Sequence, residues 1–371
     1  MHGGLHALTT ARPQLMTVRT AAQALGLRPH ELLHAGPPLA DPCRPPLTLA
    51  SSIVMTCVHE GWATDEAAAE ALLRRGALRL SPAQDRGCVT PLAAVVAAGT
   101  PLLEVEDAQG GSARTWAPLS AVRGADTRMG CRSPGLLDRL KNRDTVVAPA
   151  LQQALAAHGP LPLWPLALQG LLAGDDLHAS TAHANQALVA ALSARGAGAL
   201  AEDIAATPLF FLTLWMAASA WLLRVAEAGG PPGLITRGGG NGERFAIALA
   251  GRPGQWFNVP ATPPLGPCLP GVADSVPIEG AIGDSAVIDL LGLGGQRLVA
   301  GTPEAIDLCS PHPLLPEGWR LGMDAHRVLA QARSPQVRLA MLARDGRGGL
   351  CGRGVYRPPL ALFEQAVHGL A

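Results

Sequence analysis

The stretch TPLFFLTLWMAASAWLLRV, residues 207–225, decides most about the fold of this chain. No charged residue occurs from 204 to 223. Thr207-Pro208 is typical of an N-cap followed by the first position of a helix. A helix of about 16 residues is about 24 Å long, shorter than the hydrocarbon core of about 30 Å. We therefore predict a buried central helix over Leu209 to Val225, and not a membrane span.

The sequence around this stretch predicts further helices. Strand patterns vanish after residue 133, and helical spacing of apolar residues occurs at Leu136 to Leu155, Leu161 to Leu172 and Ala182 to Leu192. We therefore expect a central helical domain over residues 133–228.

Residues 1–132 alternate strand and helix patterns. Glu31 to His34 is typical of a strand, and the following Gly36 and two prolines enforce a turn. Helical patterns follow at Thr48 to Val58 and after the Asp65 cap, and strand patterns occur at Ala77 to Leu80 and Pro101 to Val105. This alternation predicts a Rossmann-like N-terminal α/β domain over residues 1–132.

The last third of the chain returns to short apolar runs. After the Gly- and Pro-rich break at 228–233, such runs occur at Phe245 to Leu249, Ala286 to Leu291 and Gln336 to Leu342. We predict a C-terminal Gly-rich α/β or α+β domain over residues 229–371. The fold class expected for the whole chain is therefore α/β multidomain, with a helical domain in the middle.

The composition restricts the classes of partner. The chain has 29 Lys and Arg against 29 Asp and Glu, and no run of basic residues. It therefore has no excess positive charge to attract the phosphates of nucleic acid, and we expect no nucleic-acid partner. Lys141 is the only lysine, so any binding of an anion by a positive side chain must come mainly from arginine. Its planar guanidinium suits carboxylate and phosphate oxygens. The seven cysteines are widely spaced without a C-x-x-C pair, which disfavours a disulfide framework or a zinc ribbon. The N-terminus has no apolar h-region, so we expect a cytoplasmic protein with no membrane partner.

Three glycine-rich stretches indicate a possible anion site. They are 237–242, 292–295 and 346–354, and two of them carry arginine. Without Cβ atoms such loops can turn successive N–H groups toward an anion, or they can simply serve tight turns. None is a P-loop or a G-x-G-x-x-G fingerprint, so a dinucleotide-dependent oxidoreductase is disfavoured and no cofactor or metal is expected.

Two polar clusters are candidates for chemistry. Asp284 and Ser285 precede an apolar run, where they could cap a helix or bind an amide or ureido group. Asp176 and His178 could move protons, or Asp175 or Asp176 could cap a helix. His178 and His183 are five residues apart and do not share a helix face, so zinc is not expected.

A set of short strings, in this order, resembles the YlbE/YahG-like family, the AllG-type subunit of oxamate carbamoyltransferase. The strings are Leu33-His34-Ala35-Gly36-Pro37-Pro38, Glu60-Gly61-Trp62-Ala63, Gly174-Asp175-Asp176 with His178, Phe210-Phe211-Leu212, Asn241-Gly242, Trp256-Phe257, Gly283-Asp284-Ser285-Ala286 and Arg357-Pro358-Pro359-Leu360.

The resemblance implies a cytoplasmic subunit that works in allantoin breakdown with an FdrA-like, CoA-ligase-like protein and a third subunit. The implied reaction converts oxalurate and phosphate to oxamate and carbamoyl phosphate. For this chemistry our candidate catalytic residues are Asp176, His178 and Asp284. The candidates for binding the substrate or anion are Asn241, Gly242, Ser285, Gly294, Gly352, Arg353 and Arg357. We expect Arg353, Arg357 and Asn241 to converge on one small anion.

The chain also departs from the pattern that the resemblance implies. The resemblance implies Asn and Arg where Ala179 and Ser180 stand, Asn at Thr213 and Lys at Ala220. Each buried hydrogen bond lost weakens ligand binding by about 0.5–1.5 kcal/mol. The alternative hypothesis is therefore a divergent, non-catalytic binding or regulatory subunit that partners an FdrA-like protein.

Overall fold

The computed structural model describes residues 3–299, 310–311, 313, 315 and 320–370. The α-helices are α1 (Gly3–Thr10), α2 (Ala21–Leu25), α3 (Leu47–His59), α4 (Glu66–Arg74), α5 (Leu136–Asn142), α6 (Ala148–His158), α7 (Leu163–Ala173), α8 (Ala182–Ser193), α9 (Gly198–Ala205), α10 (Phe210–Glu227), α11 (Ala286–Leu291), α12 (Ala325–Ala330) and α13 (Leu360–His368). The strands are β1 (Pro13–Thr20), β2 (Glu31–His34), β3 (Arg79–Pro82), β4 (Pro101–Asp107), β5 (Thr115–Pro118), β6 (Leu161–Pro162), β7 (Ile235–Asn241), β8 (Arg244–Leu249), β9 (Phe257–Pro260), β10 (Ile282–Gly283), β11 (Ser310–Pro311), β12 (Arg320–Leu321), β13 (Val337–Leu342) and β14 (Leu350–Tyr356).

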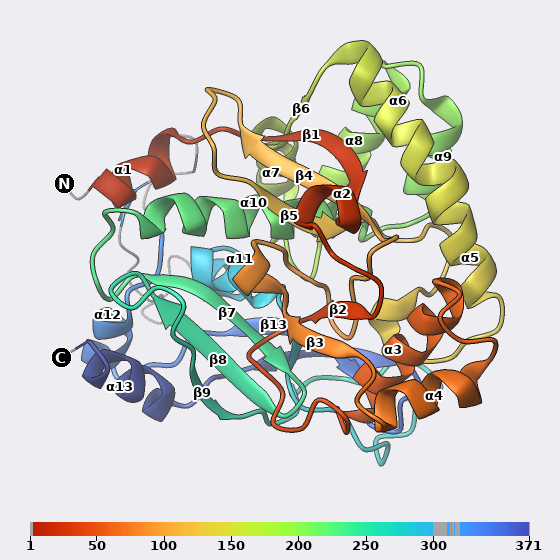
Figure 1. Ribbon diagram of the computed structural model, residues 1–371. Coiled ribbons are helices and arrows are strands. Elements are labelled where there is room, and N and C mark those ends of the chain that lie inside the picture. The colour runs from red at the N-terminus through yellow and green to blue at the C-terminus, as the bar shows by residue number, and fades with distance from the viewer. Residues whose placement is uncertain (1–2, 300–309, 312, 314, 316–319, 371) are drawn as a thin grey trace.

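Helix α10 forms the centre of the molecule, as residues 207–225 predict. It runs between the sheet that contains β1, β4 and β5 and the sheet that contains β7 and β8 (Figure 1), and it packs against strands of both sheets. Its apolar residues qualify by length and composition as a membrane span, but 72% of that window is buried inside the structure. Because protein atoms already cover this surface, burial accounts for the apolar run.

The start of α10 differs from the prediction. The helix begins at Phe210, and the Thr207 hydroxyl donates to the carbonyl of Asp203 instead of capping α10. The cap comes from another helix, because Asn185 Oδ1 of α8 accepts a hydrogen bond from Phe211 N at 3.1 Å. A sequence motif cannot show a cap that lies 26 residues away.

The two larger sheets are both antiparallel. One has the strand order β5-β4-β1-β6, and the other has the order β10-β7-β8-β9. Parallel pairing between strands occurs in the two-stranded sheet of β2 and β3, which α3 and α4 connect. The Rossmann-like expectation for residues 1–132 is therefore wrong beyond this one β-α-α-β unit. The described strands form a mixed α/β protein of several small sheets, which confirms the broader fold class.

The predicted boundaries at 132/133 and 228/229 remain a prediction. The largest hydrophobic core surrounds α10 and includes buried residues from all three ranges, such as Leu15, Trp215 and Leu291. Strand β6 at Leu161 also pairs with β1, which joins the helical range to the N-terminal sheet. The three ranges therefore share one core, and the first two also share one sheet.

Two of the glycine-rich stretches lie in strands, 237–241 in β7 and, of 346–354, residues 350–354 in β14. Gly238, Gly239 and Gly240 lie in β7 and pair with β8. A Cβ atom on Gly239 would lie 2.6 Å from Asp284 Oδ1, so the glycine allows the segment that precedes α11 to approach the strand closely. Gly352 and Gly354 lie in β14, where the backbone of residues 264–268 packs against them.

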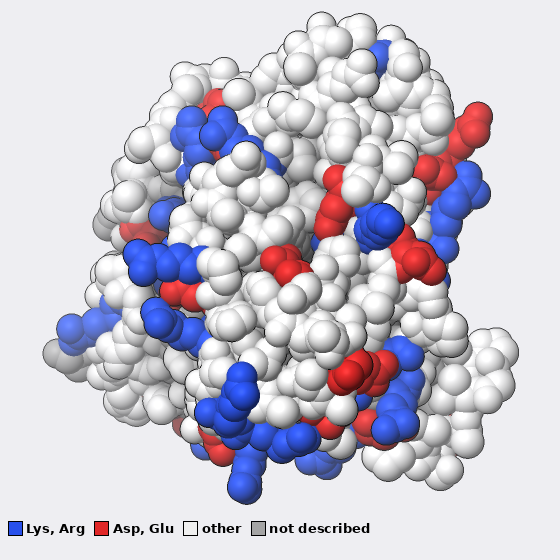
Figure 2. Space-filling model, turned by 45° about the vertical axis from the view of Figure 1, so that its right-hand side comes forward, with Lys and Arg blue, Asp and Glu red and all other residues white. Residues whose placement is uncertain are grey.

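The surface carries few charges, in keeping with 16% charged residues. Figure 2 shows acidic and basic side chains beside one another on this face, with uncharged surface between them. The six cysteines in the described part of the chain are free thiols.

Candidate functional site

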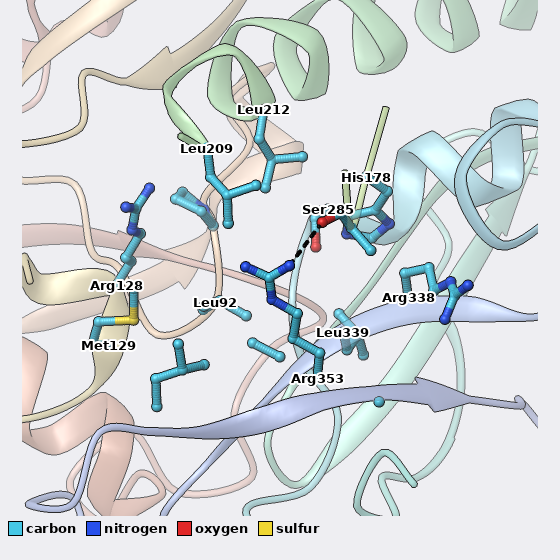
Figure 3. Close-up of a pocket in the computed structure, with 15 residues that line it drawn as sticks. Leu92, Arg128, Met129, His178, Leu209, Leu212, Ser285, Arg338, Leu339 and Arg353 are labelled. Carbon is cyan, nitrogen blue, oxygen red and sulfur yellow. Dashed lines mark hydrogen bonds between the residues drawn. The ribbon is translucent and has the colours of Figure 1, made fainter. Parts of the chain in front are cut away.

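A cavity of about 90 Å³ lies where the three parts of the sequence meet. One water needs roughly 10–15 Å³, so the cavity has room for a small organic ion. It is lined by Pro91, Leu92, Arg128, Met129, His178, Ala179, Leu209, Leu212, Ser285, Arg338, Leu339, Ala340, Leu350, Arg353 and Gly354 (Figure 3). Apolar side chains form much of the wall, and three arginines, a histidine and a serine supply the polar groups.

The loop between α7 and α8 holds His178 at the cavity. Asp176 Oδ1 accepts hydrogen bonds from the backbone N of His178 at 2.9 Å and of Ser180 at 2.8 Å. Leu177 adopts a φ of 65°, and Gly294 N donates to the carbonyl of Asp176 at 2.8 Å. A left-handed backbone is costly for a leucine and is found where surrounding structure imposes it, often at functional sites. These hydrogen bonds therefore hold the loop in one conformation.

The His178 ring pairs with a fully buried carboxylate. Its Nδ1 lies 2.7 Å from Asp289 Oδ2, and His178 is 5% exposed. Asp289 Oδ1 accepts hydrogen bonds from Gly295 N at 2.7 Å and from Arg338 N at 3.3 Å. Burial raises the pKa of Asp289, and the nearby His178 opposes that rise. The pair can hold a proton between two groups, which is the arrangement that general acid–base chemistry uses.

The three lining arginines differ in their partners. Arg128 Nε lies 3.4 Å from Asp126 Oδ1, and Arg338 Nε lies 3.8 Å from Asp176 Oδ2. Arg353 Nη1 donates to the carbonyl of Ala179 at 3.2 Å, and no carboxylate within the described ranges pairs with it. Figure 3 shows Arg128 and Arg338 on opposite sides of the cavity, with Arg353 extending between them toward Ser285. Arg353 is thus the guanidinium most free to bind an anion.

Ser285 and Leu92 also line the cavity. Ser285 precedes α11, but its hydroxyl makes no capping hydrogen bond, so the capping alternative is wrong for this residue. Leu92 has a φ of 49°, a second leucine at the site in the left-handed region. Such strain at two positions beside one cavity supports a functional role for it.

The structure brings three of the sequence-predicted residues together in the cavity wall: His178, Ser285 and Arg353. Asp176 and Gly294 lie behind His178 and fix its loop. The N–H groups of Gly292, Gly294 and Gly295 all donate to protein oxygens, so this glycine stretch offers no anion cradle.

Asp284 lies next to the site in sequence, but it does not line the cavity. It is fully buried, and its carboxylate accepts hydrogen bonds from Gly36 N, Gln84 Nε2, Thr90 N and Thr90 Oγ1. Burial raises its pKa from 3.8 to about 7, although these four donors oppose the rise. Asp284 therefore joins three separate segments, and it does not cap α11.

The expected convergence of Arg353, Arg357 and Asn241 does not occur. Asn241 is buried, and its amide donates to Pro37 O at 2.9 Å while its oxygen accepts from the N–H groups that follow β7. Arg357 is exposed just beyond β14. Neither lines the cavity, and the same holds for Gly242 and Gly352.

Sequence reasoning missed Asp289, Arg128 and Arg338. One signal could have revealed Asp289, because it is the lone acid in the apolar run of residues 286–291, and a carboxylate in a buried run needs a partner. The two arginines carry no such local signal. Within the described part of the chain, no group of three or more His, Cys, Asp or Glu side chains is placed to hold a metal ion.

Comparisons with known proteins agree with the ordered strings. The family described as oxamate carbamoyltransferase subunit AllG matches residues 78–285. The AllG subunit of oxamate carbamoyltransferase from Escherichia coli K12 is 27% identical over 97% of this chain and 94% of its own length. The uncharacterized protein YahG of the same organism is 28% identical over 93% of this chain and 79% of its own length.

A solved structure has the same fold. It is the crystal structure of a conserved protein of unknown function from Enterococcus faecalis V583, with a TM-score of 0.89 over 99% of this chain and 96% of that chain. At 23% identity this likeness shows the fold alone. The family match covers more than half of the sequence and confirms the resemblance, so this chain belongs to the AllG family, as a divergent member.

Proposed function

We propose that this chain is a subunit of an oxamate carbamoyltransferase-like complex and that the cavity holds its carboxylate-bearing substrate. The observation that carries the proposal is Arg353, which extends into the cavity without an acidic partner in the described structure, beside Ser285 and the His178–Asp289 pair. A charge-assisted hydrogen bond from a guanidinium to a carboxylate is about twice as strong as a neutral one. Family membership supports the reaction class.

The proposed reaction is the phosphorolysis of oxalurate. A phosphate oxygen attacks the carbamoyl carbon, the bond from that carbon to the oxamate nitrogen breaks, and carbamoyl phosphate and oxamate result. Arg353 would bind the carboxylate, and the Ser285 hydroxyl, which can donate or accept, would orient the amide. The apolar side chains of Leu92, Leu209 and Leu339 would limit water around the reacting atoms.

The proposal includes the setting that the family implies. We propose that the chain acts in the cytoplasm with an FdrA-like, CoA-ligase-type protein and a third subunit. The third subunit or the FdrA-like protein would supply groups that the cavity lacks, because a complex can build one site from several chains.

A second candidate function follows from one observation. Ala179 lines the cavity and Thr213 bonds to Ser120 of the protein, at positions where the resemblance implies more polar residues. This favours a non-catalytic subunit that binds the ligand or the FdrA-like partner without moving the reacting atoms. Such a subunit would bind oxamate and yet leave carbamoyl phosphate formation to other chains.

Calorimetry with oxamate tests the binding part. We expect Arg353→Ala to weaken oxamate about 10- to 150-fold, since hydrogen bonds to charged groups contribute about 1.5–3 kcal/mol. Arg244→Ala is the matched control, because Arg244 is exposed on β8 and outside the cavity. Equal affinities for wild type and Arg353→Ala would contradict the proposed binding role.

Activity separates the two candidate functions. The chain is combined with its FdrA-like neighbour and the third subunit, and carbamoyl phosphate is measured from oxalurate and phosphate. Formation of carbamoyl phosphate that Arg353→Ala reduces would support the transferase. Formation that survives replacement of both Arg353 and His178 would favour the non-catalytic subunit.

A further inference from the structure

The two carboxylate oxygens of Asp289 have different hydrogen-bond partners. Oδ1 takes two backbone N–H groups, from Gly295 after α11 and from Arg338 on β13. Oδ2 lies 2.7 Å from Nδ1 of the His178 ring. Because the backbone donors belong to two fixed elements, Oδ1 is committed to them and Oδ2 must face the histidine.

The ring of His178 is equally constrained. Its loop is held by Asp176 Oδ1 and by Gly294 N, and a Cβ on Gly294 would lie 3.0 Å from His178 Cβ. No hydrogen bond to Nε2 occurs within the described residues, and the side chain lines the cavity. Nε2 is therefore the ring nitrogen left for a ligand.

We propose that Asp289 is a positioning residue that keeps a proton on His178 Nδ1 and leaves Nε2 as the atom that transfers a proton in the cavity. The first half of this proposal, the proton on Nδ1, depends only on the geometry. The second half, proton transfer by Nε2, rests on the proposed function. The ligand class is a carbamoyl donor whose leaving group is an amide nitrogen.

The proton balance of this step closes without another reactant. His178 Nε2 takes the proton of hydrogen phosphate as the phosphate oxygen forms its bond to the carbamoyl carbon. The carbon–nitrogen bond to oxamate then breaks, and Nε2–H returns the proton to that nitrogen. During the step the imidazolium lies against the Asp289 carboxylate, which stabilises its charge.

Asp289→Asn should reverse the tautomer of His178. Gly295 N and Arg338 N require an acceptor, so the amide oxygen of the asparagine takes the place of Oδ1. The amide NH₂ then faces Nδ1 and donates to it, which moves the ring proton to Nε2. The same isosteric change leaves the packing intact.

Nitrogen NMR of the full chain labelled at histidine tests the first half. Signals of His178 are assigned by their loss in His178→Gln, and spectra are compared at the alkaline end of a pH titration. We expect protonated Nδ1 in wild type and protonated Nε2 in Asp289→Asn. His183, which pairs with Asp175 outside the cavity, is the internal control and should keep its signals. Protonated Nε2 in wild type, or an unchanged tautomer in the variant, would overturn the positioning role.

Activity of the reconstituted complex tests the second half. General acid–base catalysis contributes about 10²–10⁴-fold, so we expect Asp289→Asn and His178→Gln each to lower the rate by that factor, and His183→Gln to leave it unchanged. A reversed tautomer with less than a tenfold loss would refute proton transfer by His178. Should the wild-type complex form no carbamoyl phosphate while the tautomers behave as expected, the proposed function fails and the positioning role stands. If Asp289→Asn does not fold, the wild-type tautomer and the rate of His178→Gln still decide both halves.

Discussion

Replacing Asp284 with asparagine should remove the loss of stability that this buried carboxylate causes as the pH rises. The carboxylate is fully buried, and burial raises its pKa from 3.8 to about 7. The folded chain thus binds this proton more tightly than the unfolded chain does. The contribution of Asp284 to stability is full below pH 3.8 and is lost as the pH rises through 7. Asparagine carries no charge, so Asp284→Asn avoids that loss.

The magnitude follows from the size of the shift. Each pH unit inside this window changes stability by about 1.4 kcal/mol, so from pH 5 to pH 8 the difference between Asp284→Asn and wild type should grow by about 3 kcal/mol. Below pH 3.8 the contribution of Asp284 is complete, and there the variant should be the less stable chain. The amide of asparagine keeps one acceptor oxygen, but its NH₂ group only donates. It therefore faces N–H donors of Gly36 and Gln84 or of Thr90, which destabilises the variant by an amount that does not change with pH.

Urea unfolding followed by tryptophan fluorescence measures this difference at each pH. Other titrating groups are common to both chains and cancel in the comparison. Asp65→Asn is the control, because Asp65 is an exposed N-cap of α4 and asparagine caps equally well. A difference that stays constant with pH would show that the four donors fully offset burial and would refute the reasoning.

Two further predictions concern stability at close contacts. Gly239→Ala should destabilise the fold by about 1–3 kcal/mol, since its Cβ would lie 2.6 Å from Asp284 Oδ1. The control is Gly198→Ala, whose Cβ would have no neighbour within 4 Å. This variant should be neutral or slightly stabilising in the same urea assay. Asn185→Ala should lower stability by about 1–3 kcal/mol, because it leaves Phe211 N without its partner, whereas the carbonyl of Ile204 keeps its hydrogen bond from Thr207 N. A melting temperature equal to that of wild type would contradict the role of Asn185 as the cap of α10.

The sequence alone determined the elements whose signals are local. An uninterrupted apolar run predicted α10, and helical spacing predicted α8 at residues 182–192, within one residue of its observed end. The ordered short strings identified the family. For both helices the deciding residues lie within a few positions of one another, where backbone propensity and amphipathic periodicity act.

The tertiary structure alone decided how these elements assemble into a site. Gly238 to Gly240 are a strand because β8 pairs with them, although the same letters are typical of a loop. His178 meets Asp289 across 111 residues, and Arg128 and Arg353 line the same cavity although they lie far apart in the sequence. Such contacts depend on packing between distant segments around α10. Local propensity carries no information about that packing, so the pairing of Asp289 with His178 could be found only in the folded chain.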